Sequence, residues 1–358
     1  MEQSSPQREV RLLDPSWSVS ELMARIAKAL IGDGPALTLS PITQERVSNR
    51  IALIVRTTGS SGVAKEVGLT STALIASAQA SNKFLGADFG ATWSLALPLN
   101  HIAGINVLIR SLETGTLPIS VIGIEGKYPK ADFTSIVPTQ LYRALNGDED
   151  LLHHLQSAKK VLVGGAALTR ALRAQAESSG ITIVESYGST ETCGGCIYDG
   201  YPLEDVEVEI LESNRLAIKG KVLAHSYLNS ESELVDHNGW FVTSDTAHFE
   251  DSKIVVDGRV DDVIITGGEK VSAANIERVI AQGFPNIEFA IYAIADAQWG
   301  QAIYCAIVGT GADEEAINTY LAQECGAPAK VKKFVYCQEL PLIGIGKVDR
   351  AELARRTQ

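Results

Sequence analysis

Residues 56–67 form a short segment whose residue types suit phosphate binding. The segment, RTTGSSGVAKEV, follows the apolar run at residues 51–55 and combines glycines, hydroxyl side chains and a lysine. Glycine lets backbone N–H groups approach an anion closely, and lysine adds positive charge. A Walker A loop does not fit, because Ala64 stands where its second glycine is required and Glu66 follows Lys65. The segment predicts a phosphate cradle, with an ordinary polar turn as the alternative.

Cysteine and histidine pairs offer a second kind of chemistry. Cys193 and Cys196 form a C-x-x-C pair, but a metal site needs a second ligand pair at suitable spacing, and the sequence contains no evident one. A redox role is the alternative. Packing is the favoured interpretation, because the pair lies among glycine and hydroxyl residues of a nucleotide-type segment. The adjacent His153 and His154 are expected at the surface, near a helix end.

Six further segments with glycine, hydroxyl or charged residues follow along the chain. They are PLNHIAG (98–104), VGGAAL (163–168), SYGSTET (186–192), GWFVTSD (239–245), GRVDDVIITGGEKVSAANIE (258–277) and PLIGIGKVDR (341–350). Together with residues 56–67, and in this order, they closely resemble the motifs of the adenylate-forming superfamily. That superfamily includes acyl-CoA synthetases, luciferases and peptide-synthetase adenylation domains. The resemblance runs from about residue 50 to the end.

Two segments narrow the resemblance to one branch. YGSTETCGGCIYDGYPL (187–203) and SIVPTQL (135–141) are similar to the compact actinobacterial type of o-succinylbenzoate–CoA ligases in menaquinone synthesis. About 55 residues precede the glycine-rich segment, so we expect part of the usual N-terminal subdomain to be missing. The resemblance implies two half-reactions. ATP and a carboxylate give an acyl-adenylate and pyrophosphate, and the thiol of CoA then displaces AMP. Because the adenylate is itself activated, the protein has to position charged groups and neutralise phosphate charge.

The resemblance assigns ATP and Mg²⁺ to particular residues. The β- and γ-phosphates would be cradled by Thr57, Thr58, Gly59, Ser60, Ser61, Gly62 and Lys65. Tyr187 would stack on adenine, and the nucleotide site would also include Gly164, Gly165, Ala166, Gly188 and Ser189. Thr190 would contact the α-phosphate, and Glu191 would hold Mg²⁺, which prefers oxygen ligands. Asp245 would accept both ribose hydroxyls, and Arg259 would add a ribose or phosphate contact.

The same resemblance implies a mobile C-terminal part. Lys347 would be the main catalytic residue, bridging carboxylate and phosphate during adenylate formation, with Thr190, Glu191 and His101 completing the catalytic set. Asp261 would be the hinge about which this part rotates. Gly267 and Gly268 would then line a tunnel for CoA, because glycine permits close approach. A tight hairpin turn is the alternative for this glycine pair.

The acyl substrate carries two carboxylates, and the distal one needs a cation or several donors. By resemblance, His101 lies beside the acyl pocket. Arg110 is the first candidate for the distal carboxylate, with Thr139 and Gln140 as secondary candidates. On one continuous helix, Arg110 would lie about half a turn out of phase with His101, so the helical position does not decide the assignment.

Alternating strand and helix patterns predict the elements that position these residues. Strands are expected at residues 51–55, 93–97, 119–124, 134–137, 161–163 and 181–184, with helices at 71–85 and 168–177. This alternation predicts an α/β sheet with ligand loops at strand ends. From about residue 204, short alternating strands predict a β-rich subdomain, at residues 206–210, 215–220 and 253–258. The last part predicts an α+β pattern, with helices at 275–281 and 313–324 and strands at 288–294, 303–308 and 331–337.

These patterns predict two domains of unequal size. Residues 1–257 would form an N-terminal adenylation domain of α/β sheets and a β-rich subdomain, which binds ATP and the acyl group. Residues 258–262 would form the hinge, and residues 263–358 a smaller, mobile α+β lid domain that carries Lys347.

Composition limits the class of protein and its partners. The 358 residues carry 31 Lys+Arg against 43 Asp+Glu, a net charge of −12, and 45% are hydrophobic. An acidic chain lacks the broad positive field that draws nucleic acid or anionic membranes. Its apolar runs are shorter than the ~18 residues of a membrane helix. Five cysteines disfavour a disulfide framework and favour a cytoplasmic location. The expected partners are ATP, CoA and an aromatic dicarboxylate, with a homodimer by analogy.

Other functions stay open at this point. They are the same chemistry on another acid, a carrier-loading adenylation enzyme, and a non-catalytic AMP or adenylate binder. No carrier segment follows Arg356, which weakens the second. The motif residues Lys65, Asp245 and Lys347 are present, which argues against the third. Glu66 replaces a common glycine, and an acid there would repel polyphosphate unless its side chain turns away.

Overall fold

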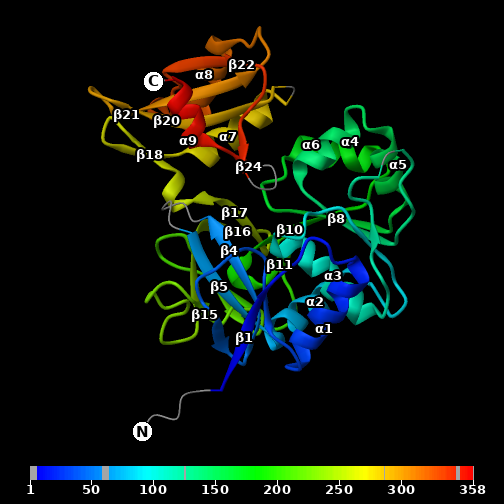
Figure 1. Cartoon of the computed structure of the whole chain (residues 1–358). Coiled ribbons are helices and arrows are strands. Elements are labelled where there is room, and N and C mark those ends of the chain that lie inside the picture. Colours follow the sequence, from blue (N-terminus) through cyan, green and yellow to red (C-terminus); the bar gives the residue numbers. More distant parts are fainter. Residues whose placement is uncertain (1–5, 59–63, 125, 286, 344–346, 358) are drawn as a thin grey trace. The chain divides into compact units, whose positions relative to one another are not determined.

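A computed structural model describes residues 6–58, 64–124, 126–285, 287–343 and 347–357 (Figure 1). For Thr58, Asp261 and Lys347 it describes the backbone alone. The chain divides into two compact units. The first comprises Met1–Gly165, Ala176–Glu209 and Ala217–Val242, and the second comprises Ala166–Gln175, Ile210–Leu216 and Thr243–Gln358. The division at residues 258–262 stays a prediction.

The first unit contains a six-stranded sheet with strand order β15-β5-β4-β2-β1-β3. Its strands are β1 (Gln7–Leu12), β2 (Ala36–Thr38), β3 (Arg46–Ser48), β4 (Ile51–Thr58), β5 (Ala64–Thr70) and β15 (Ser226–Tyr227). Strands β4 and β5 are antiparallel, with Thr57 opposite Lys65. They form a hairpin around residues 59–63.

The second sheet of this unit is mostly parallel and has the order β12-β11-β10-β9-β8-β6-β7. Its strands are β6 (Trp93–Leu95), β7 (Ile119–Ser120), β8 (Phe133–Ile136), β9 (Lys160–Gly164), β10 (Ile183–Ser189), β11 (Gly194–Tyr198) and β12 (Tyr201–Pro202). The neighbouring strands β7, β6, β8, β9 and β10 pair in parallel, in that spatial order. Strand β11 is antiparallel to β10, and β12 is antiparallel to β11. The carboxyl ends of β6, β8, β9 and β10 therefore meet at one edge, where ligands of open α/β sheets bind.

Helices α1 (Val19–Ile31), α2 (Ser71–Leu85) and α3 (Ile102–Thr114) lie together in the first unit (Figure 1). Helix α2 contacts β4 and β5 of one sheet and β11 of the other, and α3 contacts α2, β6 and β11. Thr70 caps the start of α2 by accepting from the backbone N of Ala73, and Gly86 ends it in the left-handed conformation. The small buried residues Ala73, Ser77 and Ala78 let α2 lie close to its neighbours.

Further short elements complete the middle of the chain. They are α4 (Pro138–Leu145), α5 (Glu149–Ser157), α6 (Arg170–Ser178), β13 (Val206–Ile210) and β14 (Arg215–Gly220). The hairpin of β16 (Phe241–Glu250) and β17 (Lys253–Arg259) belongs to the second unit, apart from the first two residues of β16.

The second unit contains a sheet of order β19-β18-β21-β20, which β22 joins at β21. Its elements are β18 (Val263–Thr266), β19 (Glu269–Ser272), α7 (Ala273–Gly283), β20 (Phe289–Asp296), β21 (Gly300–Val308), α8 (Glu314–Glu324), β22 (Lys333–Cys337), β23 (Leu342–Ile343), β24 (Lys347–Val348) and α9 (Arg350–Thr357). Ile291 packs in one core with α7 and α8, whereas Tyr292 packs in another with Leu353 of α9. Successive residues of β20 thus enter opposite cores.

The structure confirms the predicted α/β architecture and the helix at residues 71–85. The expected surface position is correct for His153 and wrong for His154, which is 3% exposed. The two ring nitrogens of His154 lie 2.8 Å from the carbonyl of Pro129 and 3.0 Å from Ser94 Oγ. Each residue of a helix turns by about 100°, so neighbours on α5 face different surroundings. Burial lowers the pKa of His154.

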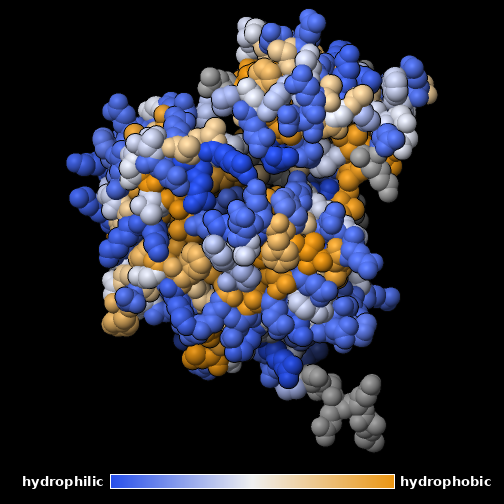
Figure 2. Space-filling view, turned by 180° about the vertical axis from the view of Figure 1, so that it is seen from behind, coloured by the Kyte–Doolittle hydropathy of each residue, from blue (hydrophilic) through white to orange (hydrophobic). Residues whose placement is uncertain are grey.

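The surface mixes apolar patches with hydrophilic side chains on the face shown in Figure 2. Large exposed apolar side chains of the first unit include Ile31, Phe89 and Leu117. Among the described residues, no helix combines the length and the apolar character that crossing a bilayer requires.

Candidate functional site

Predicted site residues of the first unit follow four neighbouring parallel strands. His101 follows β6, Thr139 and Gln140 follow β8, Gly164 and Gly165 stand at the end of β9, and residues 187–191 lie at and beyond the end of β10. Because these strands are adjacent and parallel, their carboxyl ends share one edge of the sheet. Gln140 links two of these ends, since its Nε2 donates to the carbonyl of Ala96 at 2.9 Å. Thr139 is exposed.

Glycines at this edge are required by close backbone contacts. A Cβ added to Gly164 would lie 2.9 Å from the carbonyl oxygen of Ser186 in the neighbouring strand. A Cβ on Gly188 would meet the carbonyl of Gly194. Gly165 has φ of 84°, a left-handed conformation that favours glycine. The strand ends can therefore offer their backbones to a flat ligand beside Tyr187, and Ala166 follows them directly in the chain.

The turn that carries Thr190 and Glu191 is held from below. It is a short 3₁₀ helix, Thr190–Thr192, followed by Cys193 in the left-handed conformation. The carbonyl of Cys193 accepts from Asn106 Nδ2 at 2.8 Å and from Ser77 Oγ at 3.2 Å. Side-chain donors from α3 and α2 thus hold the backbone directly after Glu191 in place against the two helices.

The cysteines behind this turn are packing residues. Cys193 and Cys196 are free and fully buried. Burial raises the pKa of Cys193 and raises that of Cys196 to about 12, so both stay protonated thiols at neutral pH. Within the described part of the chain, no three His, Cys, Asp or Glu side chains are grouped for metal binding.

Strand β5 brings Lys65 close to Glu191 through Tyr227, a residue that the sequence analysis missed. Lys65 Nζ lies 4.3 Å from the ring centroid of Tyr227, and Tyr227 OH donates to Glu191 Oε1 at 3.2 Å. Strand β15 pairs Tyr227 with Val67 of β5, which fixes this position. Burial, followed by the charge of Glu191, raises the pKa of Tyr227, so it stays a hydroxyl donor. Neither a motif nor a spacing marks Tyr227, which lies in a two-residue strand.

Asn229 fastens the outer edge of β5 in the same place. Its Oδ1 accepts from the backbone N of Glu66 at 2.9 Å, and its Nδ2 donates to the carbonyl of Ala64 at 2.8 Å. The Glu66 side chain is 6% exposed, and alternation along β5 turns it to the opposite face from Lys65. The acid therefore points away from the face of β5 that carries Lys65.

His101 and Gly104 begin helix α3 beside the sheet edge. His101 is the N-cap residue, without a side-chain capping bond among the described residues. Burial lowers its pKa, which favours the neutral imidazole near pH 7. A Cβ on Gly104 would collide with the backbone of Pro98, so the glycine lets the first turn of α3 lie against the preceding loop.

Arg110 lies deeper, between α3 and the sheet, and is 3% exposed. Its guanidinium donates to Ser135 Oγ at 3.1 Å and to Tyr198 OH at 3.3 Å, and it lies 5.0 Å from the ring centroid of Trp93. Its Nε is buried without a partner among the described residues. A buried cation with neutral partners is costly and therefore suits an anionic ligand. Its contact with a substrate stays a prediction.

The second unit brings the two expected ribose contacts together. Asp245 and Arg259 face each other across the β16–β17 hairpin, with Arg259 Nη1 3.7 Å from Asp245 Oδ1. Thr243 Oγ1 accepts from the backbone N of Asp245 at 3.0 Å, which restrains the backbone of Asp245 within β16. The pairing makes a carboxylate and a guanidinium available at one point of the hairpin.

The Gly267–Gly268 turn joins β18 to β19 and lies beside an aromatic cation pair. Both glycines have positive φ, 60° and 84°, as a two-residue hairpin requires. A Cβ on Gly267 would lie 3.1 Å from the Trp299 ring, and Lys332 Nζ lies 4.0 Å from the centroid of that ring. Trp299 is 37% exposed. Sequence reasoning missed both residues, which lie 30 or more positions beyond the glycines.

Several predicted residues cannot be placed fully. Gly59, Ser60, Ser61 and Gly62, as well as Gly344 and Gly346 beside the lysine, lie outside the described residues. The side chains of Thr58, Asp261 and Lys347 lie outside them too, although the backbone of Lys347 begins β24 and that of Asp261 lies in a 3₁₀ turn, Val260–Asp262. The roles of all these residues stay predictions.

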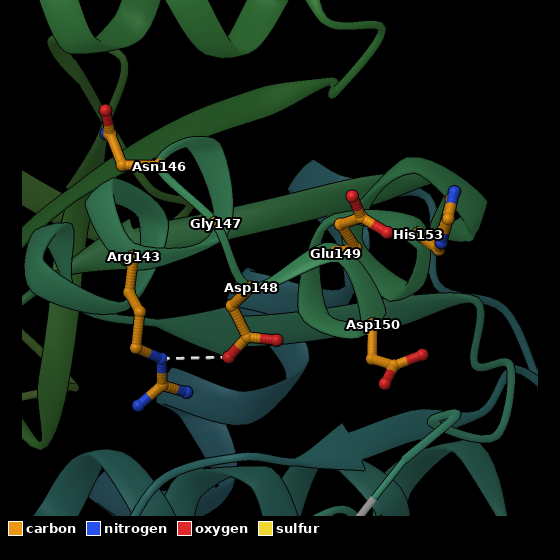
Figure 3. A pocket seen from close by; sticks show the side chains of 7 residues that line it. All are labelled: Arg143, Asn146, Gly147, Asp148, Glu149, Asp150 and His153. Carbon is orange, nitrogen blue, oxygen red and sulfur yellow. Dashed lines mark hydrogen bonds and ion pairs between the residues drawn. The ribbon is translucent and has the colours of Figure 1, made fainter.

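A hollow of about 720 Å³ opens between α4 and α5 (Figure 3). Arg143, Asp148, Glu149, Asp150 and His153 are among the residues that line it. Arg143 Nε donates to Asp148 Oδ2 at 3.0 Å, and Asp148 Oδ1 caps α5. These bonds explain the polar lining structurally, and no predicted site residue is among the described residues that form it.

Comparisons with known proteins agree with the motif order. The family model "AMP-binding enzyme" matches residues 3–218, and "AMP-binding enzyme C-terminal domain" matches residues 275–347. A probable 2-succinylbenzoate–CoA ligase of Mycobacterium tuberculosis is 35% identical over 94% of this chain and 94% of its own. The 2-succinylbenzoate–CoA ligase of Escherichia coli is 31% identical over 70% of this chain and 57% of its own.

Solved structures share the fold. An Escherichia coli MenE variant with bound OSB-AMS has a TM-score of 0.75 at 24% identity, covering 97% of this chain and 81% of the other. Bacillus subtilis MenE with the acyl-adenylate OSB-AMP has a TM-score of 0.73 at 22% identity, covering 96% and 82%. The family model and the 35% identity agree with the sheet edge and the motif residues. The chain therefore belongs to the AMP-binding enzyme family, in its AMP-forming CoA ligase group.

Proposed function

We propose that this protein joins 2-succinylbenzoate to CoA through an acyl-adenylate. The substrate carboxylate oxygen attacks the α-phosphorus of ATP and pyrophosphate leaves. The thiol of CoA then attacks the acyl carbonyl carbon and AMP leaves. The observation that carries the proposal is that Lys65 and Tyr227, on β5 and β15 of the six-stranded sheet, converge with Glu191, which lies beyond β10 of the other sheet. The 35% identity to a probable ligase of this substrate supports the choice of acid.

Residues of the first unit would hold the nucleotide. Lys65 would neutralise phosphate charge, Thr190 would contact the α-phosphate, and Tyr187 would stack on adenine. Glu191 and its neighbouring hydroxyls are the oxygen donors that Mg²⁺ prefers, so Glu191 fits as its protein ligand. That ion supplies charge neutralisation on the phosphates when it is bound.

The second unit would provide a different element to each half-reaction. Asp245 and Arg259 would hold the ribose, and Lys347 would bridge carboxylate and phosphate during adenylate formation. Rotation about Asp261 would then exchange the lysine for the Gly267–Gly268 turn. Trp299 and Lys332 would contact CoA there, because an aromatic face and a cation suit an adenine and a phosphate. We further propose that the enzyme works in the cytoplasm, where ATP and CoA are available, and as a homodimer.

The acyl pocket would use His101 at its mouth and Arg110 at its base, with Thr139 and Gln140 at the neighbouring strand end. Arg110 would bind the distal carboxylate of 2-succinylbenzoate. We expect Arg110→Met to raise KM for this acid about 10- to 100-fold, as expected for loss of one charged hydrogen bond. Arg110→Lys should recover part of the loss. KM for ATP should not change, and equal changes in both constants would contradict the assignment.

The first experiment is incubation with ATP, Mg²⁺, CoA and 2-succinylbenzoate, followed by mass analysis for the CoA thioester. Benzoate and a fatty acid run in parallel. A thioester with 2-succinylbenzoate alone is the expected result. A thioester with another acid keeps the chemistry and removes this substrate. Pyrophosphate without any thioester would indicate a carrier protein as acceptor, and no pyrophosphate with any acid would indicate a nucleotide binder.

A further inference from the structure

The last residues of two of the motif segments of the second unit contact each other in the structure, although neither residue was assigned a role. Glu277 ends the segment at 258–277 and lies on α7, and Arg350 ends the segment at 341–350 and begins α9. Arg350 Nη2 donates to both carboxylate oxygens of Glu277, at 2.8 Å and 2.7 Å. The two side chains are 26% and 25% exposed, so water screens the pair only in part.

Both side chains also bond to the same backbone unit of β20. Arg350 Nε donates to the carbonyl of Ile291 at 2.8 Å, and the backbone N of Ile291 donates to Glu277 Oε1 at 2.8 Å. Strand β20 pairs only with β21 among the described strands. The free edge of β20 is thus closed at Ile291 by two side chains that also pair with each other.

These hydrogen bonds lie directly after β24, the strand that begins at Lys347. Strands β23 and β24 pair with each other, with Leu342 opposite Val348, and the backbone N of Asp349 donates to the carbonyl of Pro341 at 2.7 Å. Only Val348 and Asp349 separate Lys347 from Arg350.

A second attachment of β24 is apolar. Val348 packs against a buried cluster that includes Leu340, Tyr292 and Leu353. Apolar contacts limit how far Val348 can move from the cluster, but they do little to fix the orientation of the two strands. A bidentate, charge-assisted ion pair fixes their orientation as well. The ion pair is therefore the attachment that can set the angle at which the two strands leave the sheet.

We propose that Arg350 and Glu277 are positioning residues for Lys347: their pair fixes the β23–β24 hairpin to the edge of β20 for adenylate formation. The proposal rests on the proposed role of Lys347. The second half-reaction uses the Gly267–Gly268 turn, which lies on β18 and β19 and shares no bond with the pair among those described. Breaking the pair therefore slows adenylate formation and spares thioester formation.

The test compares Arg350→Met, Arg350→Lys and Glu277→Gln with Arg356→Met, a matched loss of an exposed arginine on the same helix. Single-turnover adenylate formation and thioester formation from supplied acyl-adenylate are measured separately. Arg350→Met should slow the first about 10²-fold, the order expected for a misplacement of about 1 Å. It should leave the second nearly unchanged. Arg350→Lys should recover part of the rate, and Arg356→Met should change neither.

Amide hydrogen exchange tests the attachment without any activity. Arg350→Met or Glu277→Gln should speed exchange in residues 340–349 while α8 stays protected. An unchanged exchange pattern, or an equal loss in both half-reactions, would overturn the proposal. If Arg350→Met does not fold, Glu277→Gln carries both measurements. A wild-type protein that makes no adenylate would refute the proposed function, and the exchange result would still decide the attachment.

Discussion

The two units hold their candidate functional turns in different ways. In the first unit, the turn of Glu191 is tied from several elements: two donors hold the carbonyl of Cys193, and Tyr227 holds the carboxylate. In the second unit, the Gly267–Gly268 turn and the β23–β24 strands are local hairpins attached at their feet. A turn held by bonds from several elements keeps one geometry. The two hairpins of the second unit belong to separate small sheets, and we propose that each serves a different half-reaction.

The largest expected effect separates the two units by half-reaction. Lys347→Ala should slow adenylate formation about 10³-fold, the upper range for removal of one charge-stabilising group. Thioester formation from supplied adenylate should survive, because in our proposal it uses the Gly267–Gly268 turn and not Lys347. Rapid-quench measurement of pyrophosphate and thioester checks both. An equal fall in the rates of adenylate and thioester formation would contradict the proposal that each half-reaction uses a different hairpin.

The next effect tests the fixed site of the first unit. Glu191→Gln keeps the shape and removes the charge, so adenylate formation should fall about 10²-fold. The loss should be partly relieved at high Mg²⁺, because the remaining oxygen donors bind the ion more weakly. Rates across a Mg²⁺ titration measure this. A loss independent of Mg²⁺ would mean that Glu191 acts in another way.

A smaller effect is expected for Trp299, which lies beside the Gly267–Gly268 turn. Trp299→Ala should raise KM for CoA about tenfold, since stacking of one base contributes roughly 1–3 kcal/mol. Adenylate formation should be unchanged. Exposed Phe89→Ala on the first unit is the control, and should leave KM for CoA as it is. A changed rate of adenylate formation in Trp299→Ala would contradict the division of labour.

The smallest effect sharpens the account of the fixed site. Tyr227→Phe removes one hydrogen bond to Glu191 and keeps the ring beside Lys65. A neutral donor contributes about 1 kcal/mol, so adenylate formation should fall about fivefold. Burial raises the pKa of Tyr227, so its hydroxyl stays protonated. The ratio of the rate of adenylate formation in Tyr227→Phe to that in the wild type should therefore stay constant from pH 6 to 9. A ratio that varies with pH in this range would show that Tyr227 titrates.

Local patterns predicted some elements closely and missed others for a physical reason. The apolar spacing at residues 71–85 has good caps at both ends, and it became α2 with the same bounds. The run at 119–124 became a strand of only two residues, Ile119–Ser120. Strands β1 to β3 were not predicted, since their short runs gain stability by pairing: β1 pairs with β2 and β3, and β2 pairs with β4. Helix α1 was not predicted either, although Ser18 and Glu21 form a capping box at its start and Gly32 ends it in the left-handed conformation.

The candidate site was predicted unevenly for a related reason. Residues such as Lys65, Glu191 and Asp245 were assigned roles because they lie in motifs that resemble those of the family, and their roles stay predictions. Tyr227 lies 36 positions from Glu191 and has no motif, so only the sheet that pairs β15 with β5 brings it to the site. His154 was wrongly expected at the surface, because adjacent positions on a helix can face the core or the solvent.

By itself, the sequence led to the chemistry through the order of its motifs, which resembles that of the AMP-forming family and assigns roles to the motif residues. The alternating elements predicted the α/β fold, and the acidic balance argued against nucleic acid and anionic membranes as partners. Only the tertiary structure decided which of these residues touch. Glu277 and Arg350 lie 73 positions apart and are joined at one backbone unit of β20. Such contacts depend on how helices α7 and α9 pack against a distant strand, and no spacing in the sequence marks the side chains that this packing joins.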